Sequence, residues 1–201
     1  MSYGFEARNA ANEIVIDNSF PVYELSAPST ITSNVPNSTT SSGNWVFPVP
    51  PLGVLRFWKL NVGDGISLAP DKFIGNKQTY TIRDVVPASS LPDPSGYGMA
   101  IYDSNGQKVY ATNGQLLTIG DKYSVQLQSD GSRPPVNVSD SWVAIETFVM
   151  NMVPVNPFFG GILSSGTKRT SATQMAYYGA GFASAPAGYT FFNPVKFITA
   201  K

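Results

Sequence analysis

The sequence contains no cysteine and no histidine, and only 13% of its 201 residues are charged. Without cysteine no disulfide can form, and the Ser–His and Cys–His pairs of many nucleophilic enzymes are excluded. Thiolate and imidazole metal ligands are missing as well. The 13 basic and 13 acidic residues cancel, so the chain lacks the positive field on which nucleic-acid binding normally depends. We therefore expect no nucleic-acid partner.

Long hydrophobic runs are also absent. No apolar run approaches the roughly 18 residues of a membrane helix. The first residues lack the basic region and apolar core of a secretory signal. We expect neither membrane insertion nor signal-dependent export. No longer segment keeps the 3.6-residue period of an amphipathic helix, and residues 166–178 predict at most one helical turn.

Turn formers and alternating residues are abundant instead. The chain has 18 glycines and 16 prolines, and a hydrophobic content of 42% that is sufficient for a sizeable core. Pro48, Pro50 and Pro51 exclude a central strand at their position. A buried central strand is expected at 141–152, and two short strands are expected around Gly120-Asp121. Further strands are predicted at 54–60, 66–68, 77–86, 189–192 and 195–199. The predicted class is all-β, with a β-sandwich-like architecture.

Two segments are expected to be long irregular loops. Residues 26–44 are polar and low in complexity, and residues 154–188 show no clear strand pattern. Within the second segment, Lys168 and Arg169 stand together in a polar stretch that is typical of a solvated loop. Loops of this length in a compact domain often reach partners. We expect both segments to contact other chains.

One phrase occurs twice, as SYGFEARNAANEIVID at 2–17 and GYGMAIYDSNGQKVYA at 96–111. Each predicts a strand, a turn and a return strand. At an offset of 94 positions three residues are identical, namely Tyr3/Tyr97, Gly4/Gly98 and Val15/Val109. Asn12 and Gly106 are expected to share a turn position with positive φ.

The repeat has two interpretations. Any two hairpins look alike at this level, or the chain consists of two related halves. In the second case the boundary falls at the proline-rich stretch 87–96, with an N-terminal β half at 1–90 and a C-terminal β half at 91–201. The two halves can be separate or can pack as one sandwich.

The opening MSYGFEARNAANEIVID resembles the N-terminus of small tail-associated proteins of tailed bacteriophages. These begin with Met, a small residue and Tyr-Gly, and often carry a second such phrase, here Tyr97–Tyr110. The chain differs at Asn12, where Gly is common, and at Ala111-Thr112, where Asp-Ser is expected. The resemblance implies a structural virion protein at the tail tip, baseplate or fibre attachment, assembled in the host bacterial cytoplasm. Its partners would be other tail subunits, in a homo-oligomer or another symmetric assembly.

An alternative function is a receptor- or glycan-binding module at the tail tip. Flat aromatic side chains stack on sugars and anchor protein interfaces. The candidate contacts for a ligand or an interface are Trp45, Tyr177, Tyr178 and Tyr189. The competing interpretation is that aromatic residues of this C-terminal region belong to core strands.

An enzyme is the third class considered. Paired carboxylates can hydrolyse glycosides when they converge, but Asp64, Asp71, Asp93 and Asp103 are scattered and are typical of turns. The stretch from Asp103 has Gly114 where a calcium loop has its bidentate glutamate. We predict no enzymatic activity, no catalytic residue, no metal site and no cofactor.

Overall fold

The structure is a computed structural model in which the chain is almost entirely β. It describes residues 6–8, 14–17, 23–37, 43–90, 93, 99–103, 105–111, 115–116, 118–129, 132–140, 142–146, 150–156, 159–186 and 193–200. Within these ranges the only helical element is the 3-10 turn η1, Ala88–Ser90. The predicted strand at 189–192 lies outside them.

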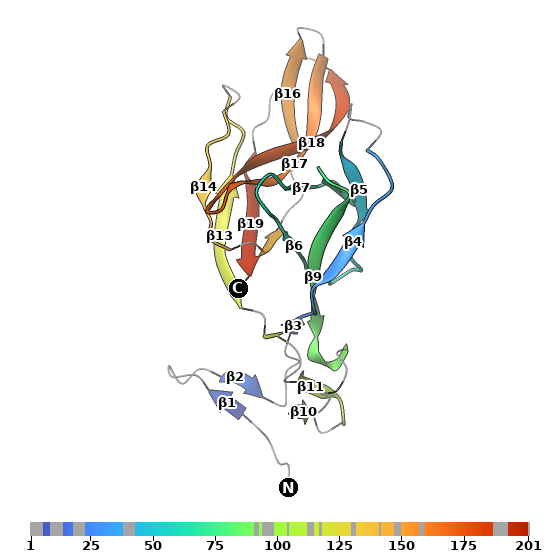
Figure 1. Cartoon of the computed structure of the whole chain (residues 1–201), viewed down its shortest axis with the longest axis vertical. Helices are drawn as coiled ribbons and strands as arrows, with labels where there is room; N and C mark the ends of the chain where they lie inside the picture. The colour runs from blue at the N-terminus through green and yellow to red at the C-terminus, as the bar shows by residue number, and fades with distance from the viewer. Residues whose placement is uncertain are drawn as a thin grey trace.

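The larger of two extended sheets has eight antiparallel strands (Figure 1). The path β12-β3-β9-β6-β15-β19-β13 orders seven of them, and β4 pairs with β9 beside β3. Their bounds are β3 Tyr23–Leu25, β4 Ser29–Thr32, β6 Arg56–Lys59, β9 Thr79–Pro87, β12 Gln115–Leu116, β13 Ile119–Val125, β15 Trp142–Ile145 and β19 Val195–Ala200.

The second extended sheet has seven strands. Six follow the path β14-β18-β17-β7-β8-β5, and β16 also pairs with β17. Their bounds are β5 Trp45–Pro48, β7 Gly65–Leu68, β8 Lys72–Gly75, β14 Val136–Asn137, β16 Met150–Asn156, β17 Phe159–Ser171 and β18 Gln174–Pro186. Strands from both sides of residue 90 share each sheet, since β6 pairs with β15 and β7 pairs with β17. The two sequence ranges therefore contribute to one sandwich.

Two further hairpins form sheets of their own. β1 Glu6–Arg8 pairs with β2 Ile14–Asp17, and β10 Ala100–Tyr102 pairs with β11 Lys108–Ala111. Figure 1 shows both at one end of the molecule, below the large sheets. Both hairpins predicted from the repeated phrase are confirmed. Gly106 has φ of 77°, as expected, whereas Asn12 lies outside the described residues.

The core fills the space between the two extended sheets. Phe47 and Phe73 from the seven-stranded sheet meet Trp58 and Tyr80 from the eight-stranded one. The ring centroids of Trp58 and Phe73 are 4.9 Å apart, and those of Phe47 and Tyr80 are 5.3 Å apart in an edge-to-face arrangement. Such aromatic pairs add to the stabilisation from buried area. Because all four rings are buried, this cluster joins the two layers.

Several local predictions are confirmed. The strands expected at 54–60, 66–68, 77–86 and 195–199 correspond to β6, β7, β9 and β19. Strand β5, which ends at Pro48, lies at the edge of its sheet, as the missing amide hydrogen of proline requires. The all-β, sandwich-like class is likewise confirmed.

Other predictions are wrong. Residues 141–152 form no single central strand, because β15 belongs to the eight-stranded sheet and β16 to the other. Gly120 and Asp121 lie inside β13, at a register shift between Ile119 and Lys122. The segment 154–188 contains the long β17–β18 hairpin, so 166–178 is not an irregular loop or a helical turn but two paired strands joined by a tight turn at Ala172-Thr173. Part of the 26–44 segment pairs as β4.

Candidate functional site

Two of the aromatic residues predicted as ligand or interface contacts, Tyr177 and Tyr178, are buried in the structure. Tyr177 and Tyr178 follow each other on β18, so their side chains point to opposite faces. Tyr177 packs into the core and its hydroxyl lies 2.9 Å from that of Ser165. Tyr178 is buried on the other face, and its hydroxyl donates to Asn44 Oδ1 at 2.8 Å. Their assignment to the surface is corrected, because the pairing of β18 places both rings in the interior.

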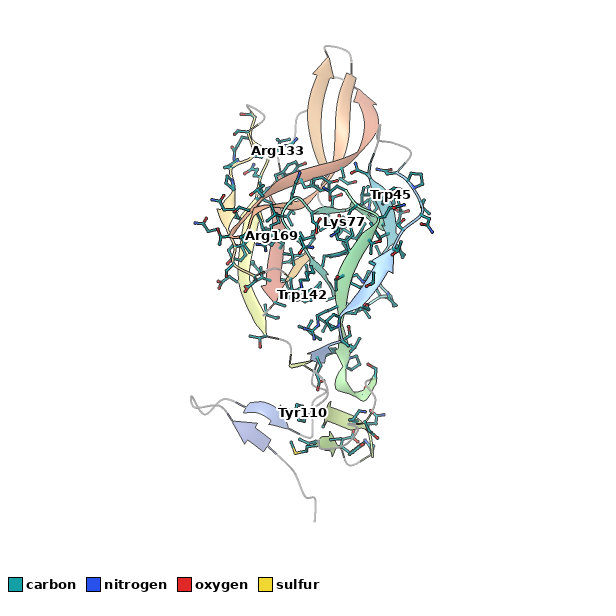
Figure 2. All side chains as sticks on the ribbon, in the orientation of Figure 1. Trp45, Lys77, Tyr110, Arg133, Trp142 and Arg169 are labelled. Carbon is teal, nitrogen blue, oxygen red and sulfur yellow. The ribbon has the colours of Figure 1, made fainter. Side chains whose placement is uncertain are left out.

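Trp45 is half-buried at the start of the edge strand β5 and packs against the core. Part of its ring remains exposed, and a ligand or interface contact there stays a prediction. Tyr189 lies outside the described residues. In Figure 2, Trp45 is on the opposite side of the sandwich from Arg169. Since Tyr177 and Tyr178 are buried, Trp45 is the described candidate that keeps exposed surface for a contact.

Arg169 was expected in a solvated loop, and this is wrong. It lies in β17 with 3% of its surface exposed. Its guanidinium donates to the backbone carbonyls of Val138, Asp140 and Ala172. Burial lowers the pKa of Arg169, and the nearby Asp140 partly offsets that effect. The side chain therefore fastens the segment after β14 to the β17–β18 hairpin.

The acidic residues serve the turns in which they lie. Asp64 accepts a hydrogen bond from the backbone N–H of Asn61 and pairs with Lys77. Asp71 is exposed beside Lys72. Asp103 accepts from two backbone N–H groups of its own turn, at Asn105 and Gln107. In the part of the chain that the structure describes, no three acidic side chains are placed to hold a metal ion.

A polar network surrounds Tyr80 at one end of the core. The Tyr80 hydroxyl donates to the Gly65 carbonyl and accepts from the backbone N–H of Asn76. The Lys77 ammonium lies 4.6 Å from the centroid of the Tyr80 ring. Burial raises the pKa of Tyr80 far above its ordinary value, and the neighbouring Tyr178 and Asp64 add to this. These contacts tie the start of β7 to the segment that follows β8.

The second hairpin carries its own polar cluster. The carboxylate of Asp93 accepts hydrogen bonds from Lys108 Nζ and the Tyr102 hydroxyl, both at 2.9 Å. These two bonds hold the pKa of Asp93 below its ordinary value. Lys108 and Tyr102 are directly paired across β10 and β11. The cluster therefore ties Asp93, from the segment preceding the hairpin, to both of its strands.

The two hairpins share one geometry. In the first, Glu6 pairs with Asp17, Ala7 with Ile16 and Arg8 with Ile14. Adding 94 to each number gives the second, in which Ala100 pairs with Ala111, Ile101 with Tyr110 and Tyr102 with Lys108.

Each hairpin also contains a β-bulge, and the two bulges lie at equivalent positions. The register shifts between Ala7 and Arg8 in the first hairpin and between Ile101 and Tyr102 in the second. The extra residue of the β-bulge is therefore Val15 in the first and Val109 in the second. Bulges re-aim strands and are specific features rather than defects. The resemblance between the phrases thus extends to the backbone. The sequence shows that Val15 and Val109 are identical, but its short alternating pattern does not reveal the bulge.

No helix among the described residues is long and apolar enough to cross a membrane. No family model, curated protein or solved structure matches the chain.

Proposed function

We propose that this chain is a non-enzymatic structural protein of a tailed-bacteriophage virion, which assembles at the tail tip, baseplate or fibre region through protein–protein contacts. The observation that carries the proposal is the repeated Tyr-Gly phrase whose two copies form hairpins of identical register and bulge. That phrase is the part of the sequence that resembles small tail-associated proteins. The partners are other tail subunits, in a homo-oligomer or another symmetric assembly.

The surface supports a role in assembly. Exposed large hydrophobic side chains include Tyr23 on β3, Met99 and Tyr102 at the β10 hairpin and Ile119 on β13, and others lie in further segments, namely Val35, Val49, Leu52 and Val62. Figure 1 shows β3 and the β10–β11 hairpin toward the same end of the molecule, whereas β13 runs along the side of the sandwich. Exposed apolar side chains are surface that a partner subunit can cover. The low charge content is compatible with a subunit that neighbours cover.

The test is the composition of purified particles. Virions of the phage that encodes this chain are banded on a density gradient and washed in high salt, and their proteins are quantified by mass spectrometry. We expect the chain at a fixed copy number per particle, and gold-labelled antibody against it at the tail end. A phage replication protein in the same lysate serves as the control and should be absent. A chain that is abundant in the lysate but absent from particles contradicts the proposal.

The alternative, a receptor- or glycan-binding module, gains no specific support from the aromatic residues. Tyr177 and Tyr178 are interior, and only part of Trp45 is accessible. A sugar stacks on an exposed ring face. Glycan-array binding that is lost in Trp45→Ala, with the unfolding midpoint retained, would establish the alternative.

A further inference from the structure

The likeness between the two hairpins does not extend into the sandwich. The hairpins correspond when 94 is added to the residue numbers of the first. When 94 is added to the residue numbers of β6 and β9, they correspond to β16 and approximately to β18. β6 and β9 pair with each other, whereas β16 and β18 lie on either side of β17. The matched geometry is thus confined to the two hairpins. If the two halves of the chain were equivalent as wholes, their sandwich strands would match too. The match of the hairpins alone is better explained by a requirement on the hairpins themselves.

Neither hairpin is part of a larger sheet within the described residues. An isolated two-stranded hairpin is at best marginally stable in water, and its outer edges carry backbone groups that can pair with another chain. Both hairpins lie at the same end of the molecule, as Figure 1 shows. Two equal units at one end can therefore contact one partner together.

Among the described residues, three of the eight exposed large hydrophobic side chains lie at the second hairpin or on β3. Met99 and Tyr102, at the second hairpin, are 47% and 46% exposed, and Tyr23 on the neighbouring β3 is 51% exposed. Exposed apolar side chains are therefore present both at this hairpin and on β3. A partner protein that contacts the hairpins can bury such side chains, and their burial would contribute to binding.

We infer that the two hairpins are equivalent binding units that engage two copies of the same surface on a homo-oligomeric protein. Units with the same strand register and the same bulge present the same arrangement of backbone groups along their edges, so they fit equal sites. Two linked units bind with an effective concentration that strengthens the overall attachment. This inference rests on the proposed function, since it takes the partner to be an oligomeric tail protein of the same particle.

Exchange of the hairpins tests their equivalence. In one variant, residues 6–17 are replaced by the sequence of residues 100–111, and in a second the replacement is reciprocal. A control variant carries at 6–17 an unrelated hairpin of the same length without a bulge. Each chain complements a phage that lacks the gene, and copies per particle are measured by mass spectrometry. Circular dichroism and the urea midpoint establish that each variant folds.

If the units are equivalent, both exchanged chains enter particles at the wild-type copy number. The control should enter at least about tenfold less, because it loses one of two linked contacts. Exchanged chains that fold but are excluded like the control overturn the inference. Equal incorporation of the control overturns it too, because the geometry of the first hairpin would then be irrelevant.

Electron cryomicroscopy of wild-type particles provides a second measurement that needs no variant. Hairpins seated on the same residues of two subunits of one protein confirm the inference. Hairpins on different surfaces, or on none, overturn it and leave the proposed virion function intact. Absence of the wild-type chain from particles overturns both, so the two failures are distinguishable.

Discussion

Arg56 and Asp84 form a two-bonded ion pair between the adjacent strands β6 and β9. Arg56 Nε donates to Asp84 Oδ1 at 2.7 Å, and Arg56 Nη2 donates to Oδ2 at 2.8 Å. The side chains are 9% and 23% exposed. A fork-to-fork arrangement of this kind combines strength with fixed geometry. It therefore fixes the register of two central strands at the end of the sandwich near the hairpins.

Asp84→Asn should destabilise the chain by about 2 kcal/mol, because the mostly buried guanidinium of Arg56 loses its counter-charge. Urea unfolding followed by fluorescence measures this. Glu146→Gln is the control, because it removes the partner of Lys122, a lysine whose side chain is 66% exposed. This substitution should lower the free energy of unfolding by less than about 1 kcal/mol. Equal effects of the two substitutions would contradict the role assigned to the Arg56–Asp84 pair.

Arg169→Met should cost about 3 kcal/mol, since methionine fills much of the volume but leaves three backbone carbonyls without their donor. Urea unfolding and hydrogen exchange at 136–140 should both report the change. Lys168→Met, the neighbouring substitution on the same strand, serves as the control. Normal protection at 136–140 in Arg169→Met would show that the guanidinium does not fasten this segment.

Tyr80→Phe should cost about 1.5 kcal/mol near neutral pH, because the Gly65 carbonyl loses a buried donor. The raised pKa of Tyr80 also predicts a pH dependence. The folded state binds this proton more tightly than the unfolded state, so the contribution is complete below about pH 10 and is lost above it. Urea midpoints should fall less steeply above that pH in Tyr80→Phe than in the wild type. Parallel alkaline profiles would contradict this.

Lys108→Met should raise the pKa of Asp93 toward its ordinary value, because the strongest hydrogen bond to the carboxylate is removed. The lowered pKa in the wild type means that the folded state favours the carboxylate. The contribution is therefore present at neutral pH and is lost as the pH falls through that pKa. Carbon NMR of the labelled carboxyl group measures the shift. Lys122→Met, at a distant lysine in β13, should leave the pKa of Asp93 unchanged.

Features that depend on a few neighbouring residues were predictable from sequence. The Asn-Gly pair predicts the turn from Asp103 to Gly106, and the prolines at 48, 50 and 51 exclude a central strand. The structure adds that an edge strand, β5, ends at Pro48. The hairpin pairing followed from alternation and turn chemistry. The bulges at Val15 and Val109 were not foreseen, because a shift of one pairing position leaves no mark in a short alternating pattern.

The sequence by itself determined the all-β class, the turns and the two matched hairpins, since local steric preferences and proline and glycine chemistry act within a few residues. Only the tertiary structure decided that 141–152 divides between two sheets and that Tyr177, Tyr178 and Arg169 are interior. Their burial depends on partners distant in the chain, such as Asn44 for Tyr178 and Val138 for Arg169. The inward polar groups of such a strand can be buried because they are hydrogen-bonded. The sequence shows only that the residues are polar, which is typical of a loop, and does not show their distant partners.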